Sequence, residues 1–385
     1  MKNRKCIVYC INSLTGGGGT ARVVAQKASY FADVLDYSVH IIVSKQGSSP
    51  IDYNFSNKIS IHFMDKELAF RSPRVPGLRF YLFLRNARRK YSKLIEEISP
   101  DIVTVVGPFF EDLIIPKICK KQNIISIREF HFAIKANAYL TTCYKDRCRR
   151  LKLKLQQFIS TKQMYKYNCL VILTNSDLKE HRSSNATRIE VIPNVSSIGI
   201  IDKMPNLDSK QVISVGSMRS NVKRFDMQIR IWKEFLKKHP DWTLHIYGDG
   251  IEMQRLRDLV EELDLISNVF LHGSTSHIGV KYLESSIYLS TSIAEGMPMT
   301  ILEATEAGLP VVSIDCPCGP SDIIKENVTG YLVKEGDFDI LLSRLDLLAT
   351  NLELRRIMSK NAKIEAVKYF PSEIMPQWVE LYESL

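Results

Sequence analysis

The sequence lacks both the cysteine spacing of a metal site and the long apolar runs of a membrane protein. Its eight cysteines include no C-x-x-C pair, and Cys6, Cys10 and Cys169 lie inside apolar stretches, where a thiol is usually a small buried hydrophobe. No stretch approaches the roughly 18 apolar residues of a spanning helix, and the first apolar stretch, 6–11, is too short for a signal-peptide core. We therefore expect no structural zinc site, disulfide framework, targeting segment or membrane-spanning helix.

Acidic residues are scarce in one half of the chain. Residues 1–200 contain 32 Lys and Arg but only 15 Asp and Glu, whereas residues 201–385 contain 20 and 27. A basic half is typical of proteins that bind nucleic acid, an anionic membrane surface or a phosphate-bearing substrate. No helix-turn-helix, zinc-finger or RNP pattern accompanies the charge, so nucleic acid is not the expected partner.

Two basic segments, 71–90 and 145–168, mix Arg and Lys with Phe, Tyr and Leu. Helices that lie on anionic lipid have this mixture, although solvated helix faces would give the same pattern. We expect a cytoplasmic protein that is peripheral on the inner face of the cell membrane and binds that anionic surface through its basic N-terminal domain.

Chain length and residue pattern predict an α/β protein of two domains. The 385 residues exceed one ordinary domain, and 45% of them are apolar, as in soluble globular proteins. Short β-branched runs alternate with amphipathic helical stretches, which indicates parallel sheets covered by helices. Strands are predicted at 6–11, 39–44, 58–64, 101–106, 123–127, 169–174 and 189–193, and again at 212–216, 243–248, 268–273, 287–291 and 311–315. The stretch 195–210 has no sustained periodicity and is the predicted linker, so the functional site is expected in the cleft where the strand ends of the two domains face each other.

Four consecutive glycines, 16–19, stand between the first predicted strand and the first predicted helix. Gly16, Gly18 and Ala21 fit the dinucleotide fingerprint G-x-G-x-x-G/A loosely, but the acid expected at the end of the second strand is missing. An NAD site is therefore not favoured. Glycines do allow a backbone to approach a ligand closely, and the helix N-terminus beyond them suits a phosphate; a flexible turn is the alternative.

The most informative segment is 291–333, TSIAEGMPMTILEATEAGLPVVSIDCPCGPSDIIKENVTGYLV. Glu295 ends a predicted strand-to-helix loop that Gly296 and Pro298 shape, and Glu303 follows with seven residues between the two carboxylates. With its EGMPMTILEA surroundings and the later G-P-S-D-I-I stretch, the segment resembles the donor-binding motif of glycosyltransferase family 4, retaining enzymes with the GT-B fold.

The resemblance implies a fold and a reaction. The fold would be an α/β GT-B architecture in which two Rossmann-like parallel-sheet domains face an interdomain cleft. Its parts would be an acceptor-binding domain, a linker, a nucleotide-sugar donor-binding domain and a C-terminal helix that crosses back, at 1–195, 196–210, 211–368 and 369–385. The reaction would move a hexose-type sugar, with retention, from a nucleoside diphosphate sugar to a saccharide or lipid-linked acceptor in cell-surface polysaccharide or glycolipid synthesis. Family frequency favours a UDP-sugar. The alternatives are a GT-B sugar-nucleotide 2-epimerase and a non-catalytic nucleotide-sugar-binding protein.

A nucleotide sugar presents a ribose diol, a diphosphate and sugar hydroxyls, so its site needs carboxylates and free backbone N–H groups. Glu303 inside the predicted helix suits the ribose, and Glu295 on the loop suits the transferred sugar. The helix that begins near Met299 would direct its positive end at the diphosphate. Cations for the leaving group are implied by the resemblance at Lys223 and Arg219, with Arg224 as the other candidate arginine.

His131 follows a predicted strand end, where the resemblance implies a histidine that reaches the donor sugar. The candidate catalytic residues are Glu295, His131, Lys223 and Arg219. The candidate donor-binding residues are Gly18, Gly19, Gly216, Lys223, Arg219, Glu295, Gly296, Met297, Pro298, Met299, Thr300 and Glu303.

Asp337 and Asp339 form a D-x-D, the metal-binding pattern of the other large transferase fold. Here they precede a predicted helix, 340–349, where acidic residues simply cap the N-terminus. We expect no metal and no resident cofactor, because Arg, Lys and the helix dipole take the place of the cation.

Overall fold

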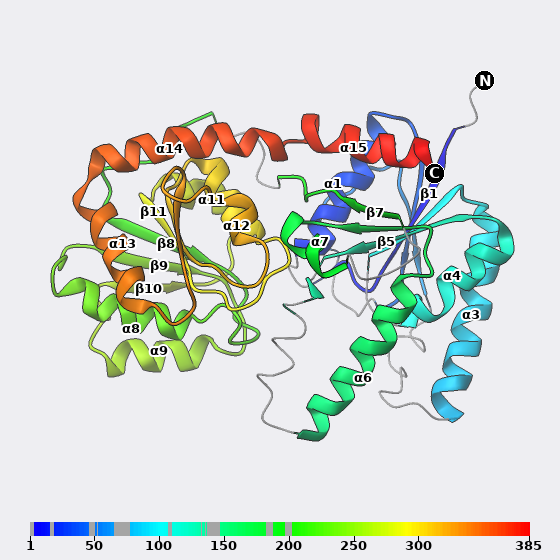
Figure 1. Cartoon of the computed structure of the whole chain (residues 1–385), viewed down its shortest axis with the longest axis horizontal. Coiled ribbons are helices and arrows are strands. Elements are labelled where there is room, and N and C mark those ends of the chain that lie inside the picture. The colour runs from blue at the N-terminus through cyan, green and yellow to red at the C-terminus, as the bar shows by residue number, and fades with distance from the viewer. Residues whose placement is uncertain are drawn as a thin grey trace.

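Two parallel β-sheets with helices packed against them form two Rossmann-like domains in a computed structural model of the chain (Figure 1). The predicted two-domain α/β class is therefore confirmed. The structure describes residues 4–15, 19–45, 51, 53–64, 78–106, 110–131, 133, 134, 136, 147–181, 188–196 and 202–385. Gly16 to Gly18, residues 197–201 of the predicted linker, and the beginnings of the two basic segments, 71–77 and 145–146, lie outside the described residues.

The first sheet has the strand order β3-β2-β1-β4-β5-β6-β7, and all its strands are parallel. In this order the chain reverses direction across the sheet between β1 and β4, and ligands bind at such a switch point. The strands are β1 (Cys6–Ile11), β2 (Ser38–Val43), β3 (Ser60–Phe63), β4 (Ile102–Val105), β5 (Ile125–Phe130), β6 (Cys169–Ile172) and β7 (Arg188–Val191). The helices are α1 (Gly19–Asp33), α3 (Leu78–Ile98), α4 (Phe110–Gln122), α6 (Arg147–Met164) and α7 (Asn175–His181).

The second sheet repeats this pattern in the order β10-β9-β8-β11-β12-β13. Its strands are β8 (Gln211–Val215), β9 (Thr243–Tyr247), β10 (Val269–His272), β11 (Ile287–Ser290), β12 (Val311–Ile314) and β13 (Gly330–Val333). Its helices are α8 (Phe225–Leu236), α9 (Met253–Glu262), α10 (Ile278–Leu283), α11 (Met299–Ala307), α12 (Pro320–Ile323), α13 (Phe338–Thr350) and α14 (Leu352–Ala366). A 3₁₀ turn, η1 (Val367–Tyr369), leads into the last helix, α15 (Pro371–Ser384).

Strand β13 is absent from the strands that the sequence predicts. It is four residues long and begins with Gly330, so its pattern shows no β-branched run. The glycine is needed because a Cβ at this position would lie 2.1 Å from the carbonyl oxygen of Val311 on β12. The close approach of the two backbones at the sheet edge thus requires a glycine at this position. A β-branched side chain, which would have indicated a strand, is therefore absent.

Helix α8 shows how apolar spacing produces packing. The sequence places Phe225, Ile229, Trp232 and Leu236 on one stripe. The first three are buried in the core of the second sheet and Leu236 packs at its edge, as expected for an amphipathic helix on a sheet. Each fully buried side chain of this size contributes roughly 1.5–3 kcal/mol.

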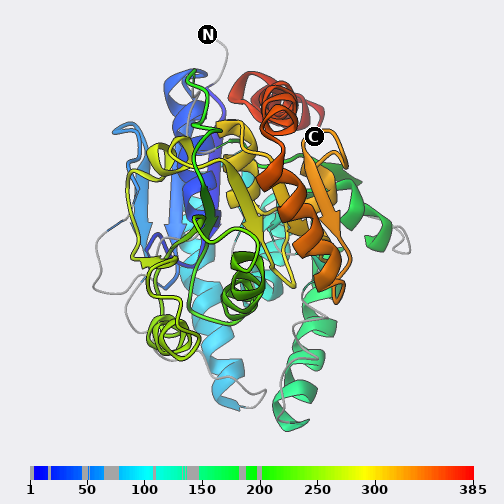
Figure 2. The same cartoon turned by 90° about the vertical axis from the view of Figure 1, so that its left-hand side faces the viewer.

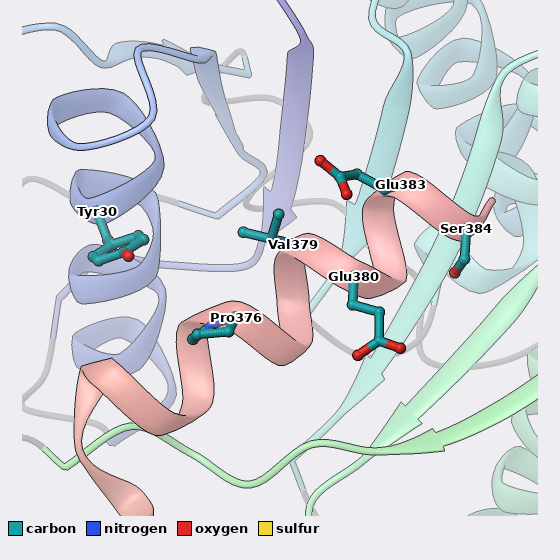
Figure 3. Close-up of a pocket in the computed structure, with 6 residues that line it drawn as sticks. All are labelled: Tyr30, Pro376, Val379, Glu380, Glu383 and Ser384. Carbon is teal, nitrogen blue, oxygen red and sulfur yellow. The ribbon is translucent and has the colours of Figure 1, made fainter.

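The last helices run along one side of the molecule from the second domain to the first (Figure 1). Helix α14 packs on α11, whereas α15 contributes Ile374, Met375, Trp378, Leu381 and Tyr382 to the core of the first sheet. A hollow of about 530 Å³ lies between α1 and α15 (Figure 3). Its lining residues are Tyr30, Pro376, Val379, Glu380, Glu383 and Ser384, none of which is a predicted site residue.

Helices α3 and α6 project from the same side of the first domain in both views (Figures 1 and 2). Both carry exposed apolar side chains: Leu78, Tyr81 and Leu82 on α3, and Leu151, Leu155 and Phe158 on α6. Within the described part of the chain, no helix combines the length and the hydropathy that crossing a membrane requires.

Candidate active site

The ammonium of Lys223 and the carboxylate of Glu295 meet at the ends of two neighbouring strands. Lys223 lies between β8 and α8, and Glu295 lies between β11 and α11. Because β8 and β11 are parallel partners, both loops leave the sheet at the same edge. Lys223 Nζ donates to Glu295 Oε1 at 2.6 Å, and the two side chains are 20% and 12% exposed. The structure thus brings together two residues that the sequence selected separately.

The surroundings of Lys223 keep its side chain charged and in place. Burial lowers the pKa of Lys223, but the Glu295 carboxylate and the Tyr288 hydroxyl oppose burial, and the pKa lies above its ordinary value. Gly216, directly after β8, leaves room for the aliphatic part of the lysine, since a Cβ there would lie 2.9 Å from Lys223 Cε. Gly216 therefore allows Lys223 to keep this position, because a glycine has no side chain that would displace the lysine stem.

Hydrogen bonds fix the loop that carries Glu295. The hydroxyl of Thr291 lies 2.9 Å from the carbonyl oxygen of Lys223 and 3.1 Å from that of Arg224. The N–H of Ile293 donates to the carbonyl of Val222 at 3.0 Å. The two loops therefore hold each other, which fixes the backbone on both sides of the ion pair.

The G-P-S-D stretch packs on the other side of the Glu295 loop. Gly319 has a φ of 99°, and a Cβ there would lie 2.4 Å from Pro298 Cδ and 2.7 Å from the carbonyl oxygen of Gly296. A residue with a side chain would meet both the left-handed backbone conformation and the loop itself. Gly319 thus allows the buried Gly296 and Pro298 to stay where they are.

The N-termini of α1 and α11 meet beside the ion pair. Helix α11 begins at Met299 after Pro298, and α1 begins at Gly19. A Cβ added to Gly19 would lie 3.4 Å from Met299 Cγ, so the two ends touch across the domain boundary. Met297 and Met299 accept hydrogen bonds at sulfur from Asn194 N and Nδ2, at 3.2 and 3.4 Å. The first N–H groups of a helix lack partners within it, so this is a place where an anion is stabilised.

Glu303 lies one turn beyond Thr300 on α11 and is 2% exposed. Its Oε1 accepts a hydrogen bond from Arg22, and its Oε2 accepts one from the Tyr282 hydroxyl at 3.0 Å. Arg22 belongs to α1, so its contact with Glu303 joins the two domains. Sequence reasoning did not select Arg22; its position three residues after the glycine cluster was the available signal.

His131 stands directly after β5, as predicted, and its side chain is 10% exposed. Its Nε2 lies 2.9 Å from Oε1 of the fully buried Glu129. Among the described residues this ring nitrogen makes no aligned hydrogen bond, so the two atoms are close without being well oriented for one.

The two candidate arginines have different surroundings. Arg224 Nε lies 3.6 Å from Asp226 Oδ1, which engages its charge on α8. The exposed side chain of Arg219 makes no ion pair with the described residues. Its backbone N–H donates a hydrogen bond to the Ser217 hydroxyl oxygen at 3.3 Å. Of the two arginines, Arg219 is therefore the one whose charge no described residue pairs, so it can contact a negatively charged ligand.

The D-x-D pair lies outside this site. Asp337 precedes α13, as expected, but its side chain makes no capping hydrogen bond, so that part of the prediction is wrong. The physical reason is its backbone, whose ψ of 61° is far from the extended conformation typical of a side-chain N-cap. Among the described residues, no group of three or more His, Cys, Asp or Glu is arranged to hold a metal ion.

The two domains make further contacts near this site. Asp322 of the G-P-S-D stretch accepts hydrogen bonds from the backbone N–H groups of Asn175 and Ser176, at 3.0 and 3.3 Å, at the start of α7. Ser196 donates to the buried carboxyl of Glu306 on α11. The second domain therefore binds the first through the same segment that carries Glu295 and Glu303.

Models of known glycosyltransferase families match both domains of the chain. The model of Glycosyltransferase Family 4 matches residues 17–195, and that of Glycosyl transferases group 1 matches residues 201–365. The lipopolysaccharide 1,6-galactosyltransferase of Salmonella typhimurium is 30% identical over 281 residues, which cover 69% of this chain and 70% of the relative. The chain belongs to glycosyltransferase family 4.

Similarity to other glycosyltransferases extends over the whole chain. An uncharacterized glycosyltransferase of Haemophilus influenzae is 28% identical over 378 residues, 97% of this chain and 99% of the relative. The solved structure of S. aureus TarM, bound to Fondaparinux, alpha-GlcNAc-glycerol and UDP, superposes with a TM-score of 0.75 at 16% identity and covers 98% of this chain and 99% of TarM. The glycosyltransferase therefore has the GT-B fold that the sequence predicted.

Proposed function

We propose that this glycosyltransferase moves a hexose-type sugar, with retention of configuration, from a UDP-sugar to a saccharide or lipid-linked acceptor in the synthesis of cell-surface polysaccharide or glycolipid. The observation that carries the proposal is the contact of Lys223 with Glu295 at 2.6 Å, next to the facing N-termini of α1 and α11. A cation, a carboxylate and two sets of free N–H groups are what a sugar diphosphate requires.

In this proposal each part of the donor has its own partner. The diphosphate lies between the two helix N-termini, where Lys223 and Arg219 neutralise the leaving group. Glu295 accepts hydrogen bonds from the hydroxyls of the transferred sugar, and His131 approaches that sugar from the first domain. The ribose hydroxyls donate to Glu303, whose contact with Arg22 couples ribose binding to the approach of the two domains.

In this reaction the protein positions the two substrates and stabilises the charge that develops on the leaving group. The acceptor hydroxyl oxygen bonds to the anomeric carbon on the face from which the nucleoside diphosphate departs, while the bond from that carbon to the phosphate oxygen breaks. The leaving phosphate takes the acceptor proton, so no separate base is required. No metal is proposed, because Lys223, Arg219 and the helix dipoles stabilise the developing charge.

The names of the relatives support the donor and the pathway class. TarM was solved with UDP, and the Salmonella relative is named as a galactosyltransferase of lipopolysaccharide. A relative from Erwinia amylovora, 24% identical over 97% of this chain, is named for amylovoran biosynthesis. The UDP bound to TarM thus supports a UDP-sugar donor, and the Salmonella name supports transfer of a hexose to lipopolysaccharide.

Thermal unfolding with nucleotides tests the donor class. We expect millimolar UDP to raise the unfolding temperature, because a ligand at 100 times its Kd adds about 2.7 kcal/mol of stability. GDP, ADP and NAD are the comparison ligands, and a shift with NAD alone would contradict the proposal. Incubation with UDP-glucose or UDP-galactose without acceptor then separates transfer from 2-epimerisation, since only an epimerase would change the sugar configuration under those conditions.

We further propose that the projecting ends of α3 and α6 bind an anionic membrane surface. Leu78 on α3 and Leu151 on α6 are 75% and 71% exposed. The same two helices carry the exposed basic residues Arg85 and Lys154. Apolar side chains that enter the lipid interface among basic residues are typical of peripheral binding.

Vesicle co-sedimentation tests this surface. We expect binding to vesicles with 30% phosphatidylglycerol but not to pure phosphatidylcholine, and about 10-fold weaker binding for Leu151→Ser/Leu155→Ser, because burying such side chains supplies roughly 1.5–3 kcal/mol each. Ile251→Ser/Ile266→Ser is the matched control, since both side chains are exposed on the second domain, at 83% and 62%. Equal losses in the two variants would contradict the assignment.

A further inference from the structure

A buried lysine connects the C-terminal helix to His131. Lys27, on α1, is 1% exposed, and its Nζ donates to Oε1 of Glu129, which is 0% exposed and lies on β5. The same Nζ lies 3.9 Å from the ring centroid of Trp378 on α15. Helix α15 therefore covers an ammonium group whose other side contacts the carboxylate next to His131.

Stability alone does not account for a charge at this position. Moving an ammonium and a carboxylate out of water costs several kcal/mol each, and apolar residues in place of a buried ion pair are often as stable or more stable. Val24, Ala28 and Phe31 on the same helix belong to the apolar core of the first sheet. An apolar side chain would therefore pack well at position 27 of α1. Packing alone does not explain why a lysine is found there.

The carboxylate of Glu129 depends on Lys27 for its orientation. Its Oε1 contacts Lys27 and lies 2.9 Å from His131 Nε2, whereas its Oε2 has no hydrogen-bond partner in the part of the chain that the structure describes. Burial raises the pKa of Glu129, but Lys27 and His131 outweigh burial and bring it to about 2. Glu129 is therefore ionised at neutral pH, and among the described residues Lys27 is the cation that donates a hydrogen bond to its carboxylate.

Other groups around the carboxylate do not replace this contact. Tyr9 on β1 and Tyr382 on α15 also interact electrostatically with Glu129, and their hydroxyls lie 3.1 Å from each other. Burial raises the pKa of both hydroxyls, so neither supplies charge at neutral pH. Among the described residues, the titratable groups that interact with the Glu129 carboxylate are therefore Lys27, His131 and these two neutral phenols.

We propose that Lys27 is a positioning residue for sugar transfer: it holds the Glu129 carboxylate against His131, and the Trp378 ring on α15 holds Lys27. The inference rests on the proposed function, in which His131 approaches the donor sugar. Lys27 acts through Glu129 and does not touch the substrate. The C-terminal helix thereby contributes to the site through a chain of three side chains rather than by direct contact.

Paired variants separate positioning from stability. Lys27→Met leaves a buried carboxylate without its cation, so we expect lower thermal stability and a kcat that falls on the order of 10- to 100-fold, the usual cost of a misplaced group. The donor KM should change less than about twofold, because ground-state donor contacts remain. Lys27→Met/Glu129→Gln removes both charges; it should regain stability and keep the low kcat. If it regains wild-type kcat as well, Lys27 only neutralises a buried charge and the proposal is overturned.

Trp378 provides a second test with a matched control. Trp378→Leu should lower both stability and kcat, and Trp378→Phe, which keeps a ring over the ammonium, should restore most of the kcat. In the second domain the ring of Trp242 lies 5.5 Å from the guanidinium of Arg355, so Trp242→Leu removes a comparable buried ring far from His131. It should lower stability only. Equal loss of kcat in Trp378→Leu and Trp242→Leu would overturn the role of α15.

A spectroscopic measurement distinguishes this inference from the proposed function. The imidazole signal of His131, identified by its absence in His131→Gln, should shift in Lys27→Met, because the Glu129 carboxylate loses the contact that holds it against the ring. An unchanged signal would overturn the positioning role even if transfer is observed. Absence of transfer in the wild-type enzyme with every nucleotide sugar would instead contradict the proposed function, while the His131 signal would still report on the Lys27 contact.

Discussion

Glu295→Gln is expected to remove sugar transfer while leaving nucleotide binding intact. The substitution keeps the size of the side chain and removes the charge that accepts the hydrogen bond from Lys223 Nζ at 2.6 Å. We expect kcat to fall roughly 100- to 1000-fold, the usual cost of losing one preorganised polar group at a reacting centre. The nucleotide contacts proposed for Glu303 and the two helix N-termini do not involve Glu295, so the thermal shift with UDP should persist.

Glu306→Gln is the matched control for this experiment. Glu306 lies on the same helix as Glu303, is buried, and receives a hydrogen bond from Ser196. Burial raises the pKa of Glu306 to about 7, so its replacement by an amide removes only part of a charge at neutral pH. Transfer rates in this variant should stay within about threefold of wild type. Wild-type rates in Glu295→Gln would show that Glu295 has no part in the reaction.

The strands were predictable because apolar β-branched runs are local. The predicted strands from β1 to β12 agree with the observed bounds within three residues at each end, and His131 indeed follows β5. Strand β13 was not predicted, because its first residue, Gly330, carries no side chain. Its position in the sheet is set by the close approach of another strand, which local sequence does not record.

The candidate site was predictable only where a motif lay within one segment. Glu295 and Glu303 were identified from a single stretch, and the geometry of the Glu295 loop follows from nearby glycines. The contact of Arg22 with Glu303 joins residues 281 positions apart, and that of Lys27 with Glu129 joins residues 102 apart. Both pairs depend on how α1 packs, and a lysine in an amphipathic helix gives no sign that it will be buried.

Lys223→Met is expected to weaken both donor binding and transfer, in contrast to Glu295→Gln. Methionine retains an aliphatic chain over Gly216, where the lysine stem lies, but removes the ammonium. A charge-assisted contact with phosphate is worth about 1.5–3 kcal/mol, so kcat/KM for the donor should fall about 10- to 100-fold. The thermal shift with UDP should shrink as well, because the lost charge faces the diphosphate rather than the sugar.

The double variant Lys223→Met/Glu295→Gln then tests whether the pair acts as a unit. Since the two side chains touch, each single substitution already removes their mutual contact, and the combined loss in kcat/KM should be smaller than the product of the single losses. Lys237→Met, at a lysine that is 66% exposed and paired with Glu234 on the surface, is the control and should change neither quantity. Multiplicative losses in the double variant would mean that Lys223 and Glu295 act independently, and an unchanged UDP shift in Lys223→Met would place the diphosphate elsewhere in the cleft.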